Sequence, residues 1–592
     1  MRRAAIQVLR SARRPTLRKV TRSRQFSFAP NNALGQRHLS RQRPSTALLT
    51  SSMQLRGTVG AVVAAGVASS AYYWYRGHQP SGVTTTADQI RSITTNAAPE
   101  MTRRALVVDQ VGSLYTGTIS GDAPLSKDTD DLGRKVIEML TPEQTTAKLR
   151  KTEESWFVGR GQGVVRYDVV QIPSNDPIED DHAEKIIEVP QNLAAADNSS
   201  SSTDWMFWGV FDGHSGWVTS AKLRQTLISF VARELNSTYT SALQDPELHF
   251  PTPEAIDKAI KTGFVRLDDE IVHESVKKLK KAQSKVAAAE LLAPALSGSC
   301  ALLSFYDSRS KLLRVACTGD SRAVLGRRGS NGKWTATPLS EDQTGGTVSE
   351  AERLRAEHPG EPNVVRNGRI LGGLEPSRAF GDASYKWSLQ TTQELKKSYF
   401  ARSANSLLKT PPYVTAEPII TTTKVEPEKG DFVVMATDGL WEMLTNEEVI
   451  GLVGQWLDAQ VGSNGSQNSQ TQSWLKSWTG GQKGLPVEDK SSSKQEGQRA
   501  PIRQQQWGTK TSMNERFIVE DKNAATHLVR NALGGKDQDQ LSALLTLPSP
   551  FSRRYRDDLT VEVIFFGDSP ANGNVSLNKE ASAPGPETKA KL

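Results

Sequence analysis

The stretch from Trp205 to His214 reads WMFWGVFDGH, an apolar run that ends in an aspartate, a glycine and a histidine. A short apolar run rich in aromatic residues predicts a buried β-strand. Asp212 would then be held at a rigid strand end, where its carboxylate can point out of the sheet. Gly213 would let the chain turn in an unusual backbone conformation, and its carbonyl would be able to approach a cation.

Acidic residues border other strand-like runs in the same way. They are Glu179-Asp180-Asp181, Asp320, Asp438-Gly439 and Asp557-Asp558. A single Asp-Gly pair is usually an ordinary tight turn. Because the pattern recurs along one chain, it predicts a cage of carboxylate oxygens, which are the ligands that Mg²⁺ or Mn²⁺ prefers.

Six short motifs occur in order along the chain: Phe211-Asp212-Gly213-His214, Ser297-Gly298-Ser299-Cys300-Ala301, Thr318-Gly319-Asp320-Ser321-Arg322-Ala323, Ser377-Arg378-Ala379-Phe380-Gly381-Asp382, Asp438-Gly439-Leu440-Trp441-Glu442 and Arg556-Asp557-Asp558-Leu559-Thr560. From about residue 150 to residue 567, the chain therefore resembles the metal-dependent serine/threonine protein phosphatases of type 2C. A finer resemblance is to the mitochondrial branch of that family, the pyruvate dehydrogenase phosphatases. It is carried by Arg166-Tyr167-Asp168, by Asn175-Asp176-Pro177-Ile178-Glu179-Asp180, by Gly439-Leu440-Trp441-Glu442 and by Tyr555-Arg556-Asp557-Asp558.

The resemblance implies two bound Mg²⁺ or Mn²⁺ ions, with a weaker third ion as a further option. Asp212 would bridge the two ions, and the Gly213 carbonyl would hold one of them. Asp438 and Asp557 would complete the other, while Glu179 and Asp180 would act through coordinated waters. Asp320 and Glu442 match the positions that serve a third ion in relatives, although the position of Glu442 is usually aspartate in the family. The ions would activate a water that attacks phosphoserine or phosphothreonine.

His214 would be the general acid that protonates the leaving alkoxide, because an imidazole titrates close to neutral pH. Many relatives grip the phosphate with an arginine four residues before the glutamate. That position is Asn175 here, so phosphate recognition must come from elsewhere. Arg378 and Arg166 are the candidates, and the alternative for both is a structural ion pair.

The remaining patterns predict an α+β fold. Residues 215 to 292 read as helical, with a second helix opening at Pro253-Glu254. Strand-like runs follow at 301–306 and 312–317, joined by a polar turn, and Val561–Phe566 reads as a closing strand. Strands interleaved with helix pairs fit two antiparallel sheets flanked by helices, a four-layer αββα sandwich, which is also the fold that the resemblance implies.

The N-terminal region has the composition of a mitochondrial presequence. Residues 1–87 contain 13 arginines, one lysine and no acid, so this stretch carries a charge of +14. Because the net charge of the whole chain is +8, the rest of the chain carries −6. The basic balance therefore gives no reason to expect nucleic-acid binding. We expect residues 1–56 to be a targeting presequence; a disordered basic tail is the alternative.

Residues 57–75 are uncharged and lie between two arginines. They would form an inner-membrane anchor or sorting segment, or else a buried helix or plain transit sequence. If this segment halts import, the catalytic domain would face the intermembrane space. If the segment passes through the membrane, the catalytic domain would enter the matrix. At the other end of the chain, Ala590-Lys591-Leu592 nearly matches a peroxisomal targeting signal, so additional targeting to peroxisomes is an alternative.

The expected organisation adds three further segments. Residues 76–150 would be a linker with a leading strand and helix, and 151–567 the phosphatase domain. A Gln/Ser-rich insertion at 458–514 would be disordered, and it would either contact a partner or be a solvated loop. Residues 568–592 would form a disordered C-terminal tail.

The two cysteines exclude a rival chemistry. A cysteine-dependent phosphatase needs an arginine six positions after its thiolate, but the residues there are Tyr306 and Ala323. We expect Cys300 and Cys317 to pack in the core.

The sequence leaves two functions to compare. One is a phosphatase acting on the pyruvate dehydrogenase E1α subunit, or on a broader set of mitochondrial or peroxisomal phosphoproteins. The other is a tethered binding protein that keeps the fold without catalysis. Because Asp212, Asp438 and Asp557 are all present, the active enzyme is favoured.

Overall fold

A computed structural model describes residues 102–110, 112–121, 125, 128–189, 203–245, 247–248, 250–399, 401–463, 484–488, 501 and 516–584. These residues belong to one compact unit. The expected presequence, the segment 57–75 and the C-terminal tripeptide lie outside the described residues. Within the described part of the chain, no helix combines the length and apolarity needed to cross a bilayer.

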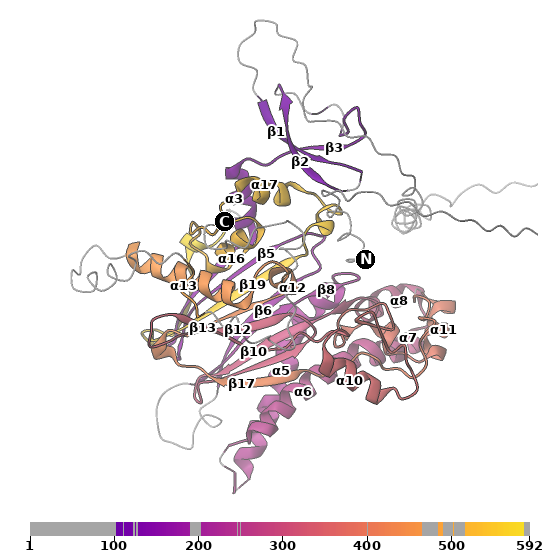
Figure 1. The fold of residues 1–592 in the computed structure, drawn as a ribbon. Helices are drawn as coiled ribbons and strands as arrows, with labels where there is room; N and C mark the ends of the chain where they lie inside the picture. The colour runs from indigo at the N-terminus through magenta and orange to yellow at the C-terminus, as the bar shows by residue number, and fades with distance from the viewer. Residues whose placement is uncertain are drawn as a thin grey trace, which may run out of the picture. The chain divides into compact units, whose positions relative to one another are not determined.

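Two antiparallel sheets form the centre of the fold (Figure 1). The first has five strands in the order β17 (Ile419–Lys424), β11 (Leu312–Thr318), β10 (Ala301–Asp307), β7 (Thr203–Phe211) and β6 (Asp181–Val189). The second has seven, in the order β13 (Trp334–Pro338), β12 (Arg322–Arg328), β18 (Phe432–Ala436), β19 (Leu559–Phe566), β5 (Val164–Ile172), β4 (Glu154–Gly159) and β20 (Asn574–Leu577).

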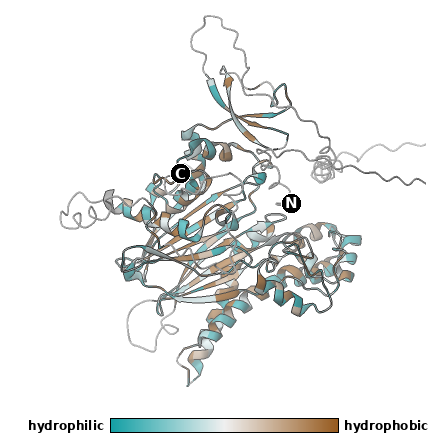
Figure 2. Cartoon of the chain, viewed as in Figure 1, coloured by the Kyte–Doolittle hydropathy of each residue, from teal (hydrophilic) through white to brown (hydrophobic). Residues whose placement is uncertain are grey.

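Three apolar clusters hold four layers together. Trp208 and Val210 of β7 pack against Val433 and Met435 of β18 between the sheets. Helices α5 (Val218–Gln244) and α6 (Pro253–Asp269) share a second cluster with the outer face of the five-stranded sheet. Helices α13 (Asn446–Ser463) and α16 (Ala524–Leu533) share a third with the seven-stranded sheet. Figure 2 shows brown, apolar segments along the strands and mixed colouring on the helices. The expected αββα sandwich is confirmed.

The remaining helices flank this sandwich or its loops. They are α3 (Pro142–Leu149), α7 (Ser275–Ala282), α8 (Lys285–Leu291), α9 (Ala293–Leu296), α10 (Val348–Glu357), α11 (Leu389–Ser398), α12 (Asp438–Trp441) and α17 (Gln538–Thr546). α10 and the residues between it and β17 have a small core of their own, to which Leu354, Ile370 and Tyr413 contribute. Two short strands, β14 (Val365–Arg366) and β15 (Arg369–Ile370), pair within this region.

Local sequence explains where the long helix pair begins. The Thr252 hydroxyl accepts a hydrogen bond from the Ala255 N–H, and Pro253 occupies the first turn of α6. A capping threonine followed by proline is a helix start signal, because it satisfies a free N–H and presets the backbone angle. Phe264 and Leu267 then face the core. The expected helix from Pro253 is confirmed.

The strand expectations are confirmed with one difference. β10 and β11 form the expected antiparallel hairpin. Val561–Phe566 falls within β19, but β19 pairs with β18 on one side and β5 on the other. It is therefore a central strand of its sheet. β20 is the last strand in sequence, so β19 does not close the fold.

Three boundaries differ from the sequence interpretation. Residues 568–592 are not a wholly disordered tail, because β20 pairs with β4 and Ala581 is buried. In the expected linker at 76–150, α3 agrees with the expected helix, but the described residues form a three-stranded sheet rather than a single strand, with β1 (Thr102–Val108), β2 (Leu114–Ser120) and β3 (Lys135–Glu138). Parts of the insertion at 458–514 are also built into the fold. α13 runs to Ser463, and Val487 bridges to Trp334. In each case a few apolar residues anchor a segment whose average composition is polar.

Candidate metal centre

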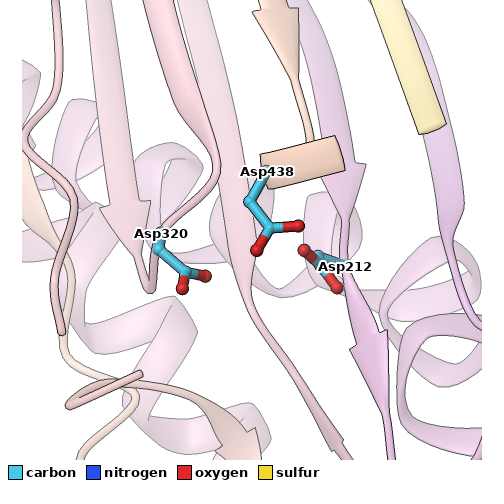
Figure 3. A group of neighbouring side chains, drawn as sticks. All are labelled: Asp212, Asp320 and Asp438. Carbon is cyan, nitrogen blue, oxygen red and sulfur yellow. The ribbon is translucent and has the colours of Figure 1, made fainter. Parts of the chain in front are cut away.

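Three aspartates from separate elements converge at one end of the sandwich. Asp212 follows β7, Asp320 follows β11, and Asp438 opens α12, one residue beyond the end of β18. One carboxylate oxygen from each lies within 4.8 Å of the others. Figure 3 shows the Asp438 and Asp212 carboxylates turned toward one another, with Asp320 beside them. The sequence prediction that strand ends bring these side chains together is confirmed for this group.

A second group adjoins the first. Asp438, Glu442 and Asp557 also offer oxygens within 4.8 Å of one another. Asp438 is therefore common to both groups, whereas the bridging role expected of Asp212 stays a prediction. An all-carboxylate donor set of this kind suits hard divalent cations such as Mg²⁺ or Mn²⁺. The residues present thus fit the metal ions that the sequence implies.

The two Asp-Gly glycines have a role that the sequence interpretation missed. Neither Gly213 nor Gly439 has a positive φ, so the expected unusual turn is wrong. A side chain at Gly213 would instead overlap the Glu179 carbonyl, and one at Gly439 would overlap the Asp558 carbonyl. These glycines allow the backbone segments that carry the acidic residues to lie close together.

The pair Glu179-Asp180 immediately precedes β6 and enters the same acidic end. Asp180 is buried, and its Oδ2 accepts hydrogen bonds from the hydroxyls of Thr437 and Thr560, each at 2.9 Å. Burial raises the pKa of Asp180, and the neighbouring carboxylates Asp558 and Asp438 raise it further. Burial likewise raises the pKa of Glu179. Carboxylates that crowd one another in this way are stabilised by a bound cation.

Asp558 shapes the loop that carries these acids, a role that was not predicted. Its carboxylate accepts hydrogen bonds from both the backbone and side chain of Ser174 and of Asn175, and from the Glu179 N–H. Asp557 and Asp558 are adjacent in sequence, so pattern alone could not distinguish the candidate metal ligand from its structural neighbour.

His214 pairs with an aspartate far away in the sequence. The distance from His214 Nε2 to Asp382 Oδ2 is 2.5 Å. A small sheet makes this possible, since β9 (Gly298–Ser299) pairs with both β8 (Gly213–His214) and β16 (Phe380–Gly381). A side chain at Gly298 would overlap both members of the pair. Burial opposes protonation, but the Asp382 carboxylate outweighs it, so the pKa of His214 is raised.

Asp382 was missed as a site residue, although it ends one of the motifs quoted above. It follows Gly381, and its own φ of 46° places it in the left-handed region. A non-glycine residue in this region is a signal of a constrained site, but it is visible only in the structure.

The two candidate phosphate-binding arginines are engaged elsewhere. Arg378 binds Glu350 through Nε and Nη2 and donates to the Glu417 carbonyl through Nη1. Arg166 holds the buried Asp168 with two hydrogen bonds, at 2.7 and 2.8 Å. Paired, hydrogen-bonded guanidinium groups of this kind support the structural ion-pair alternative for both. The phosphate-binding expectation for Arg378 and Arg166 is therefore not supported.

Both cysteines are buried and unbridged, as expected. Burial raises the pKa of each thiol, and the nearby Asp320 carboxylate adds to the effect at Cys300. A thiol with a raised pKa is a poor nucleophile at neutral pH, which agrees with the exclusion of cysteine chemistry.

Comparison with known proteins agrees with this geometry. Residues 180–471 match the family described as protein phosphatase 2C. The chain belongs to the protein phosphatase 2C family, and it is a protein serine/threonine phosphatase.

Three relatives are similar over most of their length. The mitochondrial pyruvate dehydrogenase (acetyl-transferring) phosphatase 1 of Saccharomyces cerevisiae is 45% identical over 461 residues, which cover 75% of this chain and 77% of that protein. A protein phosphatase 2C homolog of Schizosaccharomyces pombe is 46% identical, covering 72% of this chain and 85% of that protein. The human mitochondrial pyruvate dehydrogenase phosphatase 1 is 30% identical, covering 72% and 83%.

Proposed function

We propose that this protein dephosphorylates the E1α subunit of pyruvate dehydrogenase in mitochondria. The observation that carries the proposal is the 45% identity, over three quarters of the chain, to the yeast protein named as a mitochondrial pyruvate dehydrogenase (acetyl-transferring) phosphatase. The arginine-rich, acid-free N-terminal stretch supports the mitochondrial location.

The proposed active site holds two Mg²⁺ or Mn²⁺ ions. Asp212, the Gly213 carbonyl, Asp438 and Asp557 would bind them, with Glu179 and Asp180 acting through waters. Asp320 and Glu442 would serve a weaker third ion. The assignment is supported by the convergence of five of these carboxylates in two groups that share Asp438, namely Asp212, Asp320, Asp438, Glu442 and Asp557. When bound, such ions supply a hydroxide at neutral pH and stabilise charge on the phosphoryl oxygens.

His214 would supply the proton that the leaving serine oxygen needs. Because Asp382 raises the pKa of His214, a larger fraction of the imidazole is protonated at neutral pH. With Nε2 bonded to Asp382, the proton on Nδ1 is the one available for transfer. A positioned acid of suitable pKa assists cleavage most when the leaving group is a poor one.

Phosphate release from two substrates tests the proposal. Full-length protein is incubated with phosphorylated E1α or with an unrelated phosphoserine peptide, with Mg²⁺, with Mn²⁺ or with a chelator. We expect metal-dependent release that favours E1α. Equal release from both substrates would contradict the substrate assignment and favour a phosphatase of broader specificity. Absence of release with either metal would contradict the catalytic assignment and favour a binding protein.

A further inference from the structure

The arginine that binds phosphate in many relatives is absent from the corresponding position of this protein. Asn175 stands where many relatives have an arginine, and its side-chain Nδ2 donates to Asp558 Oδ2 at 3.1 Å. Its backbone N–H donates to the same carboxylate at 3.0 Å. Asn175 thus holds the loop that carries Glu179 and Asp180, and its short amide carries no charge to attract a phosphate.

The segment around Arg553 is joined directly to this loop. The buried Ser552 hydroxyl donates to the Ser174 carbonyl at 2.5 Å, which links the residue before Arg553 to the residue before Asn175. Two residues after Arg553, the Tyr555 hydroxyl donates to the Gly112 carbonyl at 2.5 Å. The backbone of Arg553 is therefore held between two fixed neighbours, beside the position that the arginine occupies in relatives.

The Arg553 side chain reaches the acidic cluster while remaining accessible. Its Nη1 forms an ion pair with Asp557 Oδ1, and 35% of its side chain is exposed. Its positive charge also acts on Glu179. Arg556, three residues later, is instead buried and donates to the Pro173 carbonyl, so it is part of the scaffold.

We propose that Arg553 binds the phosphate group of the substrate and takes the place of the arginine that is absent at position 175. A guanidinium group can donate two parallel hydrogen bonds to a phosphate, which gives both affinity and orientation. Asp557, its present partner, is an expected metal ligand. In the ion-free protein, the positive charge of Arg553 therefore pairs with the acidic cluster. In the protein loaded with metal ions, the same side chain binds the phosphate dianion. This inference rests on the proposed phosphatase function.

Equilibrium binding of inorganic phosphate tests the proposal. Calorimetry is performed on the full-length protein saturated with Mn²⁺, and Arg553→Met is compared with the wild type. We expect phosphate affinity to fall about 10- to 100-fold, the usual range for loss of a charge-assisted hydrogen bond. KM for a phosphoserine peptide should rise in parallel, and Arg553→Lys should recover part of the loss because it restores the charge without the planar fork.

Mn²⁺ binding to the metal-free protein separates this role from a structural one. Removing a cation that competes for Asp557 should leave Mn²⁺ affinity unchanged or increase it. Arg554→Met is the matched control, because Arg554 is the exposed neighbour that lies over the Phe551 ring; it should bind phosphate like the wild type.

Three results would overturn the proposal: unchanged phosphate affinity in Arg553→Met, an equal loss in Arg554→Met, or a parallel loss of Mn²⁺ affinity in Arg553→Met. Failure of the phosphatase assignment, on which the inference rests, is distinguishable, because the wild type would then release no phosphate from any substrate.

Discussion

Two buried acidic regions of this protein differ in what surrounds their carboxylates. Glu350 on α10 lies among arginines: its carboxylate accepts hydrogen bonds from Arg353, Arg378 and the Ser377 hydroxyl. Burial alone would raise the pKa of Glu350, but these partners lower it to about 2. At the metal centre, Asp180 lies near Asp558 and Asp438, and its pKa is raised.

The difference separates a structural site from a functional one. Carboxylates surrounded by guanidinium groups are already stabilised and need nothing further from solution. Carboxylates that surround one another store electrostatic repulsion, which a divalent cation can relieve. Both regions contain acids and arginines, so charge composition does not distinguish them; the geometry of the partners does.

Of the variants considered, Asp438→Asn should cause the largest loss of turnover. Asp438 belongs to both carboxylate groups, so the substitution should remove a ligand from each. We expect turnover to fall by at least about 10³-fold, because a bound ion lowers the pKa of water from 15.7 to about 7 and this advantage is lost. Phosphate release and circular dichroism are measured together. Asp539→Asn, at an exposed pair with Arg104, is the control. Activity retained in Asp438→Asn would refute the assignment of the cluster.

His214→Gln tests the role of the His214–Asp382 pair beside the metal centre. The loss should be about 10²-fold or more for phosphoserine, whose alkoxide needs a proton, and smallest for aryl phosphates, which leave readily. The ratio of kcat values for the two substrates is the measurement. An equal loss on both would argue against proton donation and in favour of a structural role for the His214–Asp382 pair.

Glu350→Gln should affect stability and leave turnover of the folded protein unchanged. The folded pKa of about 2 lies below the ordinary value of 4.5. The stabilisation is therefore complete above pH 4.5 and is lost as the pH falls toward 2. The shift corresponds to roughly 3 kcal/mol at neutral pH. Urea unfolding at pH 7 should show this difference from the wild type, and unfolding at pH 3 a smaller one.

The neighbouring variant Glu352→Gln is the control for Glu350→Gln, because Glu352 is exposed on the same helix. A difference between Glu350→Gln and the wild type that does not change with pH would contradict the ion-pair explanation. A large loss of turnover in folded Glu350→Gln would blur the distinction between the two regions.

Much of the fold could be predicted because the strand signals are local. Apolar runs such as 301–306 and 312–317 are strands, and Thr252-Pro253 starts a helix. The position of β19 in the middle of its sheet depends on pairings with β18 and β5 that are distant in sequence. β20 was missed because its polar surroundings outweigh the short alternation of Val575 and Leu577.

Site residues could be predicted where they follow a buried strand within a recognisable motif. They could not be predicted where the role of a side chain depends on which partner it contacts in the folded protein. Asp212, Asp320 and Asp438 converge as expected because each follows a buried strand. Which arginine faces the acids could not be read from sequence, since Arg166, Arg378 and Arg553 all occur near motifs and only the structure gives their partners. Asp382 was missed for the same reason.

A calorimetric titration of the metal-free, full-length protein with Mn²⁺ tests the central claim most directly. The account predicts two tightly bound ions per chain and a weaker third one, with Mn²⁺ binding weakened in Asp438→Asn, since that carboxylate is common to the two groups. Binding should also raise the melting temperature, because a ligand that binds only the folded state stabilises it. A folded wild-type protein that binds no Mn²⁺, or an Asp438→Asn variant that binds it normally, would contradict the account.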